Sequence, residues 1–218
     1  MNNNDTSSTQ DSHEFTASGY FAEWWFSFLV IAIVLTLSIL GESATQALSL
    51  HRSMIDNGEW WRIITGQVVH LSVNHTLLNA MGYIILCFGF RKEVSATEEM
   101  LALIVSMFGV GFGIYLFNPE ISWYVGLSGA IYGLLISNVM IGAKRTPTLS
   151  ALFLFFIVTK IIYEQFFAGP DRATEALIGG EVAIDSHLYG ALTGLIPGTF
   201  WVWRRHLRDS KHSPNKTA

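Results

Sequence analysis

Long apolar runs are the feature that most constrains the fold of this chain. Residues 24–41 (WWFSFLVIAIVLTLSILG) contain no charged side chain over 18 positions. At about 1.5 Å per residue, a helix of this length crosses most of a hydrocarbon core. Five further runs of helical length follow, at residues 67–90, 100–118, 124–142, 149–168 and 182–203. The pattern predicts an all-α membrane protein with a bundle of six transmembrane helices.

The composition agrees with this prediction and excludes other classes. Of the 218 residues, 50% are hydrophobic and 14% are charged, whereas about a quarter of residues are charged in a typical soluble domain. The formal net charge of −4 leaves no basic face for a phosphate backbone, so nucleic acid is not expected as a partner. The single cysteine, Cys87, allows no disulfide within the chain and is expected to be a buried packing thiol.

Polar segments at both ends frame one domain. Residues 1–22 are rich in Asn, Ser and Thr and are predicted to be a mobile cytoplasmic tail. This tail has no Lys or Arg, unlike a secretory leader, so the first span is expected to be a retained helix. Residues 205–218 are predicted to be a basic cytoplasmic tail. We expect a single six-span domain over residues 23–204.

Basic residues predict the orientation in the membrane, because cytoplasmic loops retain Lys and Arg preferentially. Those after spans two, four and six are Arg91, Lys92, Lys144, Arg145, Arg204, Arg205, Arg208, Lys211 and Lys216. On the other side are Arg52, Arg62 and Arg172. Both termini are therefore expected in the cytoplasm. Loops 42–66 and 169–181 would face outward, which we interpret as the periplasmic side of a bacterial inner membrane.

Polar groups inside spans are costly, so each is a candidate functional residue. On span two, His75 and Asn79 lie about 40° apart and share a helix face. His70 lies about 140° from His75 on the same helical count, so we expect it on another face, as a hydrogen-bonding residue near the outer interface. Ser128 on span four and His187 on span six lie at a similar shallow depth below the outer surface. This shared depth is what a catalytic site requires.

Other polar residues in or near the spans are predicted to make structural contacts or to line a cavity. Asp185 lies about 200° from His187 around span six and close to the helix start, so a contact with the helix end or a loop is expected. Gln67, Ser72 and Asn74 form a second polar edge of span two. They are predicted to line an outward-opening cavity that supplies water.

Small residues predict close contact between spans four and six. Gly129 and Gly133 lie four apart on span four, and Gly190 and Gly194 do the same on span six. Each pair leaves a strip without side chains, which lets helix backbones approach. Taken alone, the segment GLSGAIYG favours packing over chemistry. Together with the other polar residues, however, the strips would bring a serine and a histidine within hydrogen-bond reach.

These residues together resemble the rhomboid family of intramembrane serine proteases over residues 60–200. The residues that carry the resemblance are Trp61, Arg62, His70, His75, Asn79, Gly126, Leu127, Ser128, Gly129, Tyr132, His187, Gly190 and Gly194. The compact first loop and the Asp185-x-His187 sequence are similar to the rhombosortase branch. The chain departs from the pattern at Gly66, where some rhomboids carry another histidine.

The resemblance implies a serine endopeptidase without cofactor or metal. Ser128 would be the nucleophile and His187 the general base of a catalytic dyad with no third acidic member, and no carboxylate shares the inner face of span six with His187. His75 and Asn79 would bind the oxyanion. The supporting residues would be Tyr132, which packs on the His187 ring, together with His70, Gly126, Gly129 and Gly190.

The resemblance also implies the partners. The substrate would be a membrane-anchored protein, cleaved near the outer face of the lipid bilayer. In the rhombosortase branch it would carry a C-terminal Gly-Gly motif, an apolar span and a basic tail.

Other function classes fit the sequence less well. A soluble serine hydrolase needs G-x-S-x-G after a strand, but residue 130 is Ala within an apolar run. A metalloprotease is disfavoured because no H-E-x-x-H occurs. A small polytopic transporter stays open, since intramembrane His, Asn and Asp also mark ion pathways, although no inverted repeat is evident. A non-proteolytic rhomboid-like binding module would be expected to lack Ser128 or His187.

Overall fold

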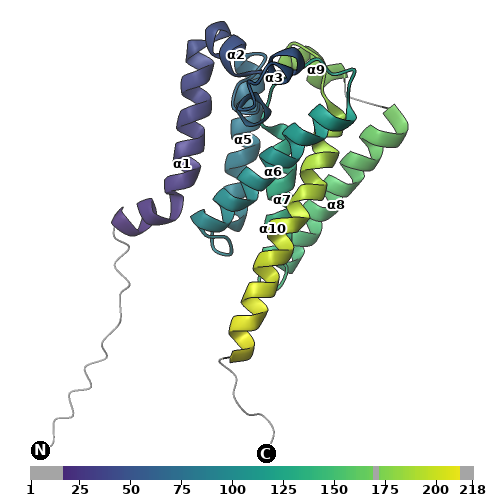
Figure 1. Ribbon diagram of the computed structural model, residues 1–218. Helices are drawn as coiled ribbons and strands as arrows, with labels where there is room; N and C mark the ends of the chain where they lie inside the picture. The colour runs from purple at the N-terminus through teal and green to yellow at the C-terminus, as the bar shows by residue number, and fades with distance from the viewer. Residues whose placement is uncertain (1–16, 169–171, 212–218) are drawn as a thin grey trace, which may run out of the picture.

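The computed structural model describes residues 17–168 and 172–211. In this part of the chain, long helices form a bundle (Figure 1): α1 (Ala17–Leu40), α5 (Val73–Phe90), α6 (Ala96–Phe117), α7 (Ser128–Gly142), α8 (Pro147–Tyr163) and α10 (Ile184–Lys211). α8 continues into a π-helical turn, η1 (Glu164–Ala168). The predicted all-α bundle is therefore confirmed.

Four helices in the described residues are long and apolar enough to cross a membrane. They cover Ala22–Leu40, Val73–Phe90, Ala96–Phe117 and Pro147–Phe167. α7, at the position of predicted span four, is an apolar helix of 15 residues. α10, at the position of predicted span six, is 28 residues long and ends in a basic segment. The composition and lengths support an integral membrane protein.

Several helix ends differ from the predicted ones. α1 begins at Ala17, so residues 17–22 of the predicted tail are helical, while residues 1–16 lie outside the described residues. α10 continues to Lys211, into the predicted basic tail, of which residues 212–218 are not described. The second span begins at Val73 rather than at residue 67, because the Ser72 hydroxyl accepts a hydrogen bond from the His75 backbone N–H (3.2 Å) and caps the helix.

Short elements gather at one end of the bundle (Figure 1). They are α2 (Glu42–Leu48), β1 (Leu50–His51), α3 (Arg52–Asp56), α4 (Arg62–Thr65), β2 (Trp123–Tyr124) and α9 (Arg172–Ile178). β1 and β2 pair antiparallel, with Leu50 opposite Tyr124. The sequence departs from the family pattern at Gly66, where some members carry a histidine. The structure gives a steric reason for glycine, since a Cβ at this residue would lie 2.5 Å from the Leu50 backbone nitrogen.

The centre of the bundle is a backbone contact between α7 and α10. A Cβ on Gly190 would lie 1.8 Å from the carbonyl oxygen of Gly129, and one on Gly194 would lie 2.1 Å from that of Gly133. Real Cβ atoms do not approach other atoms so closely. The predicted contact between the two glycine strips is thus confirmed, and it places the beginning of α7 against the beginning of α10.

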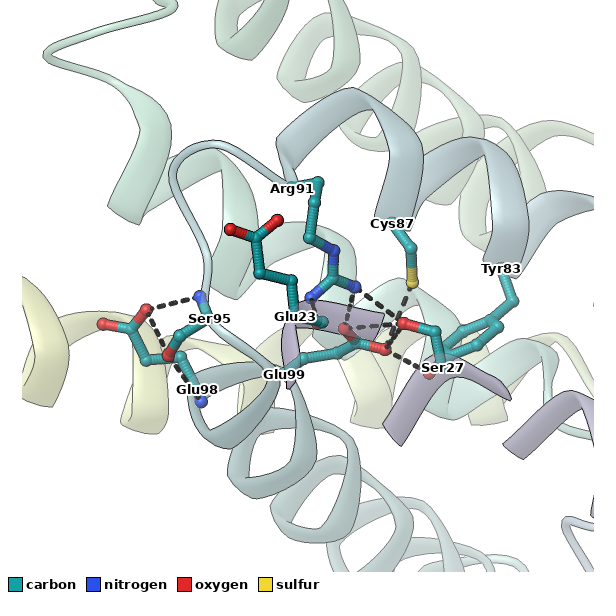
Figure 2. A network of polar contacts seen from close by, with 8 residues as sticks. All are labelled: Glu23, Ser27, Tyr83, Cys87, Arg91, Ser95, Glu98 and Glu99. Atoms are coloured by element: carbon teal, nitrogen blue, oxygen red, sulfur yellow. Dashed lines mark hydrogen bonds and ion pairs between the residues drawn. The ribbon is translucent and has the colours of Figure 1, made fainter. Parts of the chain in front are cut away.

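A buried carboxylate in the first turn of α6, at the opposite end of this helix from Asn118, joins three helices (Figure 2). Glu99 of α6 accepts hydrogen bonds from Ser27 of α1 (2.8 Å) and from Cys87 of α5 (3.3 Å). The Tyr83 hydroxyl and the Arg91 guanidinium also contact it. Because a buried charge is tolerated only when paired, the pairing of Glu99 with Arg91 holds α1, α5 and α6 together. The network around Glu99 also accounts for the burial predicted for Cys87.

Candidate active site

Ser128 and His187 meet at the end of the bundle where the short elements lie. Ser128 is the first residue of α7, and His187 lies within the first turn of α10. The His187 Nε2 atom is 3.1 Å from the Ser128 Oγ atom. The Tyr132 ring stacks on the His187 ring, with centroids 4.2 Å apart and planes inclined by 7°. A serine and a buried imidazole are thereby placed as a nucleophile and base require.

The turn before α7 sets the direction of Ser128. Gly126 has a φ of 113°, a backbone region that favours glycine. A Cβ there would also lie 2.7 Å from the Cε1 atom of His75. The sequence predicted Gly126 as a supporting residue, and its position against His75 gives a physical reason. Because Ser128 begins the helix, its backbone N–H has no acceptor within α7.

His75 and Asn79 line the same cavity as Ser128. The Leu71 backbone N–H donates to His75 Nδ1 (3.4 Å), so the ring hydrogen belongs on Nε2, which is then a donor. The Asn79 Nδ2 atom is buried and has no hydrogen-bond partner among the described residues. A buried unpaired donor normally requires an explanation. Both side chains thus offer N–H groups next to the serine.

The cavity has a volume of about 200 Å³, and most of the residues that line it have polar side chains. Besides the residues above, its lining includes Lys160, Glu164, Thr174, Glu181, Val182 and Ser186. By the same measure of cavity volume, one water needs only about 10–15 Å³. The cavity therefore has room for water beside the serine.

The predicted cavity lining was wrong for three residues. Gln67 is buried and donates to the Met107 carbonyl (2.6 Å). Ser72 and Asn74 donate to the carbonyls of Ile178 (2.7 Å) and Leu177 (3.2 Å). The reason is that α5 begins only at Val73, so these residues lie before it or in its first turn. Gln67 contacts α6 instead, and Ser72 and Asn74 hold the end of α9.

The position of His70 also differs from the prediction. It lies before α5, so the helical angle between His70 and His75 does not apply, and the two rings touch with centroids 4.9 Å apart. Neither ring nitrogen of His70 has a hydrogen-bond partner in the described part of the chain. Burial, followed by the nearby His75, lowers the pKa of His70 to about 3. His70 is thus a neutral ring that supports His75 by packing.

An acidic residue lies beside His187, contrary to the prediction. The Glu164 Oε2 atom is 2.9 Å from His187 Nδ1, and Glu164 is 3% exposed. The prediction considered only the helix of His187, whereas this carboxylate comes from the turn that follows α8. The signal in the sequence was Lys160 and Glu164, two charged residues four apart inside an apolar run.

Asp185 makes the loop contact that was predicted for it. Its carboxylate accepts hydrogen bonds from Asn118 Nδ2 (2.6 Å), just beyond α6, and from Gln165 Nε2 (3.2 Å), in η1. The Tyr189 hydroxyl in turn donates to the Asn118 side-chain oxygen (2.8 Å). These bonds fix the beginning of α10. They thereby also fix the position of His187 along the bundle axis relative to α7.

Comparison with known proteins places the chain in a family. The family described as the Rhomboid domain matches residues 57–204. The chain is 24% identical over 162 residues to YdcA of Bacillus subtilis (strain 168), a rhomboid-family protein, covering 71% of this chain and 73% of YdcA. It is 26% identical over 188 residues to rhomboid protease GlpG of Yersinia enterocolitica, covering 84% of this chain and 63% of GlpG. It is 26% identical over 146 residues to rhomboid protease GluP of Bacillus subtilis (strain 168), covering 63% of this chain and 28% of GluP. The chain belongs to the rhomboid family of intramembrane serine proteases.

Proposed function

We propose that this chain is an endopeptidase that uses Ser128 and His187 to cleave membrane-anchored proteins. The observation that carries the proposal is the 3.1 Å contact between Ser128 Oγ and His187 Nε2. This contact lies in a cavity that also presents two side-chain N–H donors. A transporter would have no use for a paired nucleophile and base, and a binding module would not need their alignment.

The reaction follows from this geometry. His187 Nε2 takes the proton from the Ser128 hydroxyl as Oγ bonds to the peptide carbonyl carbon. The proton then passes from Nε2 to the leaving amine as the C–N bond breaks, which leaves an acyl-enzyme ester. A water in the cavity gives its proton to Nε2 and attacks the ester carbonyl, and Ser128 is released when its oxygen recovers that proton.

Negative charge on the carbonyl oxygen would be met by three donors. These are His75 Nε2–H, Asn79 Nδ2–H and the backbone N–H of Ser128. The last is aided by its position at a helix N-terminus, where the dipole favours an anion. Donors already in place cost little reorganisation during the reaction, so they lower the barrier efficiently.

The proposed orientation has six spans, both termini in the cytoplasm and the active site open to the periplasm. The charge pattern supports this orientation. Most basic residues follow predicted spans two, four and six, on one side of the membrane, and cytoplasmic loops retain such residues preferentially. Loops 42–66 and 169–181 lie on the other side. The catalytic pair belongs to the end with these loops. Water would then enter from the periplasm.

The proposed substrate class is a protein anchored by a C-terminal apolar span and a basic tail, with a Gly-Gly segment near the outer surface. Its support is the rhombosortase-like Asp185-x-His187 sequence and the compact first loop. Glycine costs a helix about 1 kcal/mol per residue relative to alanine. A Gly-Gly segment would therefore unwind readily into the extended form that a serine nucleophile can attack.

Covalent labelling tests the nucleophile. We expect a fluorophosphonate probe to label the detergent-purified protein, and Ser128→Ala to remove the label because no activated hydroxyl remains. His187→Ala should slow labelling strongly, since the base is lost. A label that persists in Ser128→Ala would contradict the proposal. A sedimentation or size-exclusion profile equal to that of the unmodified protein controls for folding.

Replacing Asn79 tests the oxyanion donors. We expect Asn79→Ala to lower kcat by roughly 10²–10³-fold, the usual loss for one such donor, with the thermal unfolding midpoint changed little. Cleavage of a reconstituted membrane-anchored substrate measures this. Asn74→Ala is the matched control, an asparagine of the same helix that contacts Leu177 instead, and it should keep the rate within about twofold. An unchanged rate in Asn79→Ala would remove Asn79 from the oxyanion role.

A further inference from the structure

The carboxylate of Glu164 is enclosed beside the catalytic pair, and both of its oxygens are engaged. Oε2 is 2.9 Å from His187 Nδ1, and Oε1 is 3.1 Å from Lys160 Nζ. The Glu164 side chain is 2% exposed, whereas that of Lys160 is 30% exposed. The carboxylate is therefore separated from solvent while its cationic partner is not.

A change of helix type accounts for this position. The regular helix α8 gives way at Glu164 to the π-helical turn η1, and π turns inside helices commonly mark functional sites. The next residue, Gln165, donates to Asp185 of α10 (3.2 Å), two positions before His187. Two consecutive residues of η1 are thus tied to the first turn of α10, which fixes the carboxylate relative to the imidazole.

A purely structural ion pair explains the arrangement less well. Lys160 and Glu164 are four residues apart and could pair on the surface of any helix. Such a pair needs no burial, and a carboxylate buried within a membrane bundle is costly. Here the carboxylate meets the one ring nitrogen of His187 that does not face Ser128.

We propose that Glu164 is the positioning carboxylate of a Ser128–His187–Glu164 triad, an inference that rests on the peptidase activity proposed above. The Nδ1–H of His187 donates to Glu164, so the Nε2 lone pair is directed at the Ser128 hydroxyl. When Nε2 takes the serine proton, Glu164 stabilises the imidazolium that forms. Glu164 stays ionised throughout, and the proton remains on Nε2 until the leaving amine receives it.

Lys160 completes the arrangement. Its ammonium pairs with the second oxygen of Glu164, which favours the ionised carboxylate in a site of low dielectric. The pair carries no net charge until His187 is protonated. The triad can therefore reside in a membrane bundle without a buried excess charge in its resting state.

Glu164→Gln tests the triad through kinetics. The glutamine amide has no charge and can donate to Nδ1, which favours the wrong tautomer of His187. We expect kcat to fall on the order of 10²–10⁴-fold while KM changes less than about threefold, because the carboxylate does not touch substrate. We also expect the acidic limb of the kcat/KM profile to move to lower pH, since the negative charge that favours the imidazolium is gone.

The other titratable groups near the His187 ring are the same in the unmodified protein and in Glu164→Gln. They are Lys160 from α8, His75 from α5, Tyr132 from α7 and Glu181 from the loop before α10. Asp185, which lies two positions before His187 and bonds Asn118 and Gln165, is also unchanged. A displaced acidic limb is therefore assigned to Glu164. A merely structural ion pair would lower stability and leave the pH profile in place.

Two variants serve as controls. Glu164→Asp keeps the negative charge, so its acidic limb should stay near that of the unmodified protein, and it should recover at least about tenfold of the rate lost in Glu164→Gln. Glu99→Gln removes another buried, cation-paired carboxylate at the opposite end of the bundle. It should lower stability but keep kcat within about threefold and leave the acidic limb unchanged.

The outcomes separate the two proposals. If Ser128 is labelled in the unmodified protein but Glu164→Gln keeps its kcat within about twofold, the triad is refuted and the peptidase assignment stands. If Ser128 is not labelled at all, the peptidase assignment itself fails. Should Glu164→Gln not fold, ¹⁵N NMR of the imidazoles in the unmodified protein decides, with His187→Ala identifying the signals. Protonated Nδ1 at neutral pH supports the triad, and protonated Nε2 overturns it.

Discussion

Alanine at Ser128 or at His187 is expected to reduce substrate cleavage by about 10⁵–10⁶-fold, and the double variant should be no worse than either single one. The two side chains act as one unit across a 3.1 Å contact. Once one is missing, the other contributes nothing to proton transfer. The remaining acceleration would come from the oxyanion donors and from substrate binding.

Cleavage in proteoliposomes, measured under single-turnover conditions, provides this comparison. Ser137→Ala is the matched control, because this serine lies on the same helix, is fully buried and has no hydrogen-bond partner for its Oγ among the described residues. It should cleave at nearly the normal rate. If the losses in the two single variants multiplied in the double variant, Ser128 and His187 would be acting independently and the proposed pairing would be wrong.

The largest effect on stability is expected from Gly190→Ala. The added Cβ would lie 1.8 Å from the Gly129 carbonyl oxygen, and neither backbone can yield without moving a helix. We expect the free energy of unfolding to fall by about 3 kcal/mol or more. Because α10 carries His187, the same displacement should cost at least about 10² in cleavage rate.

Thermal unfolding in detergent micelles and the cleavage assay measure the two effects. Gly82→Ala is the matched control, since a Cβ at Gly82 has no atom within 4 Å. The same substitution should there be neutral or slightly stabilising, because alanine is the better helix former. Equal stability of Gly190→Ala and Gly82→Ala would show that α7 and α10 are not in backbone contact.

The apolar runs and glycine strips allowed much of the fold to be predicted, because a membrane imposes a minimum helix length and small residues mark close contacts. Ser128, His187, His75 and Asn79 were also singled out from the sequence, since polar groups in apolar runs are rare. Their roles remain predictions. Their proximity in the structure follows from contacts that the glycine pattern indicated.

Two features could not be predicted from helical periodicity. The loop residues before Val73 were counted as helix, so His70 and Gln67 were assigned to wrong surroundings. Periodicity also assumes regular α-helix, whereas Glu164 begins a π-helical turn and meets a histidine 23 residues away. Such contacts depend on how two helices cross, which a single sequence does not specify.

The backbone contact between α7 and α10 also bears on how substrate enters. Carbonyl oxygens of α7 pack against glycines of α10 where side chains would otherwise lie, so any sliding of one helix along the other would disrupt a tight backbone contact. The distance between nucleophile and base is therefore a fixed dimension of the scaffold. The opposite wall of the cavity, formed by α5 and α9, is joined by side-chain bonds from Ser72 and Asn74. We therefore expect any widening of the cavity for substrate on the side of α5 and α9, which side-chain hydrogen bonds rather than backbone contacts hold together.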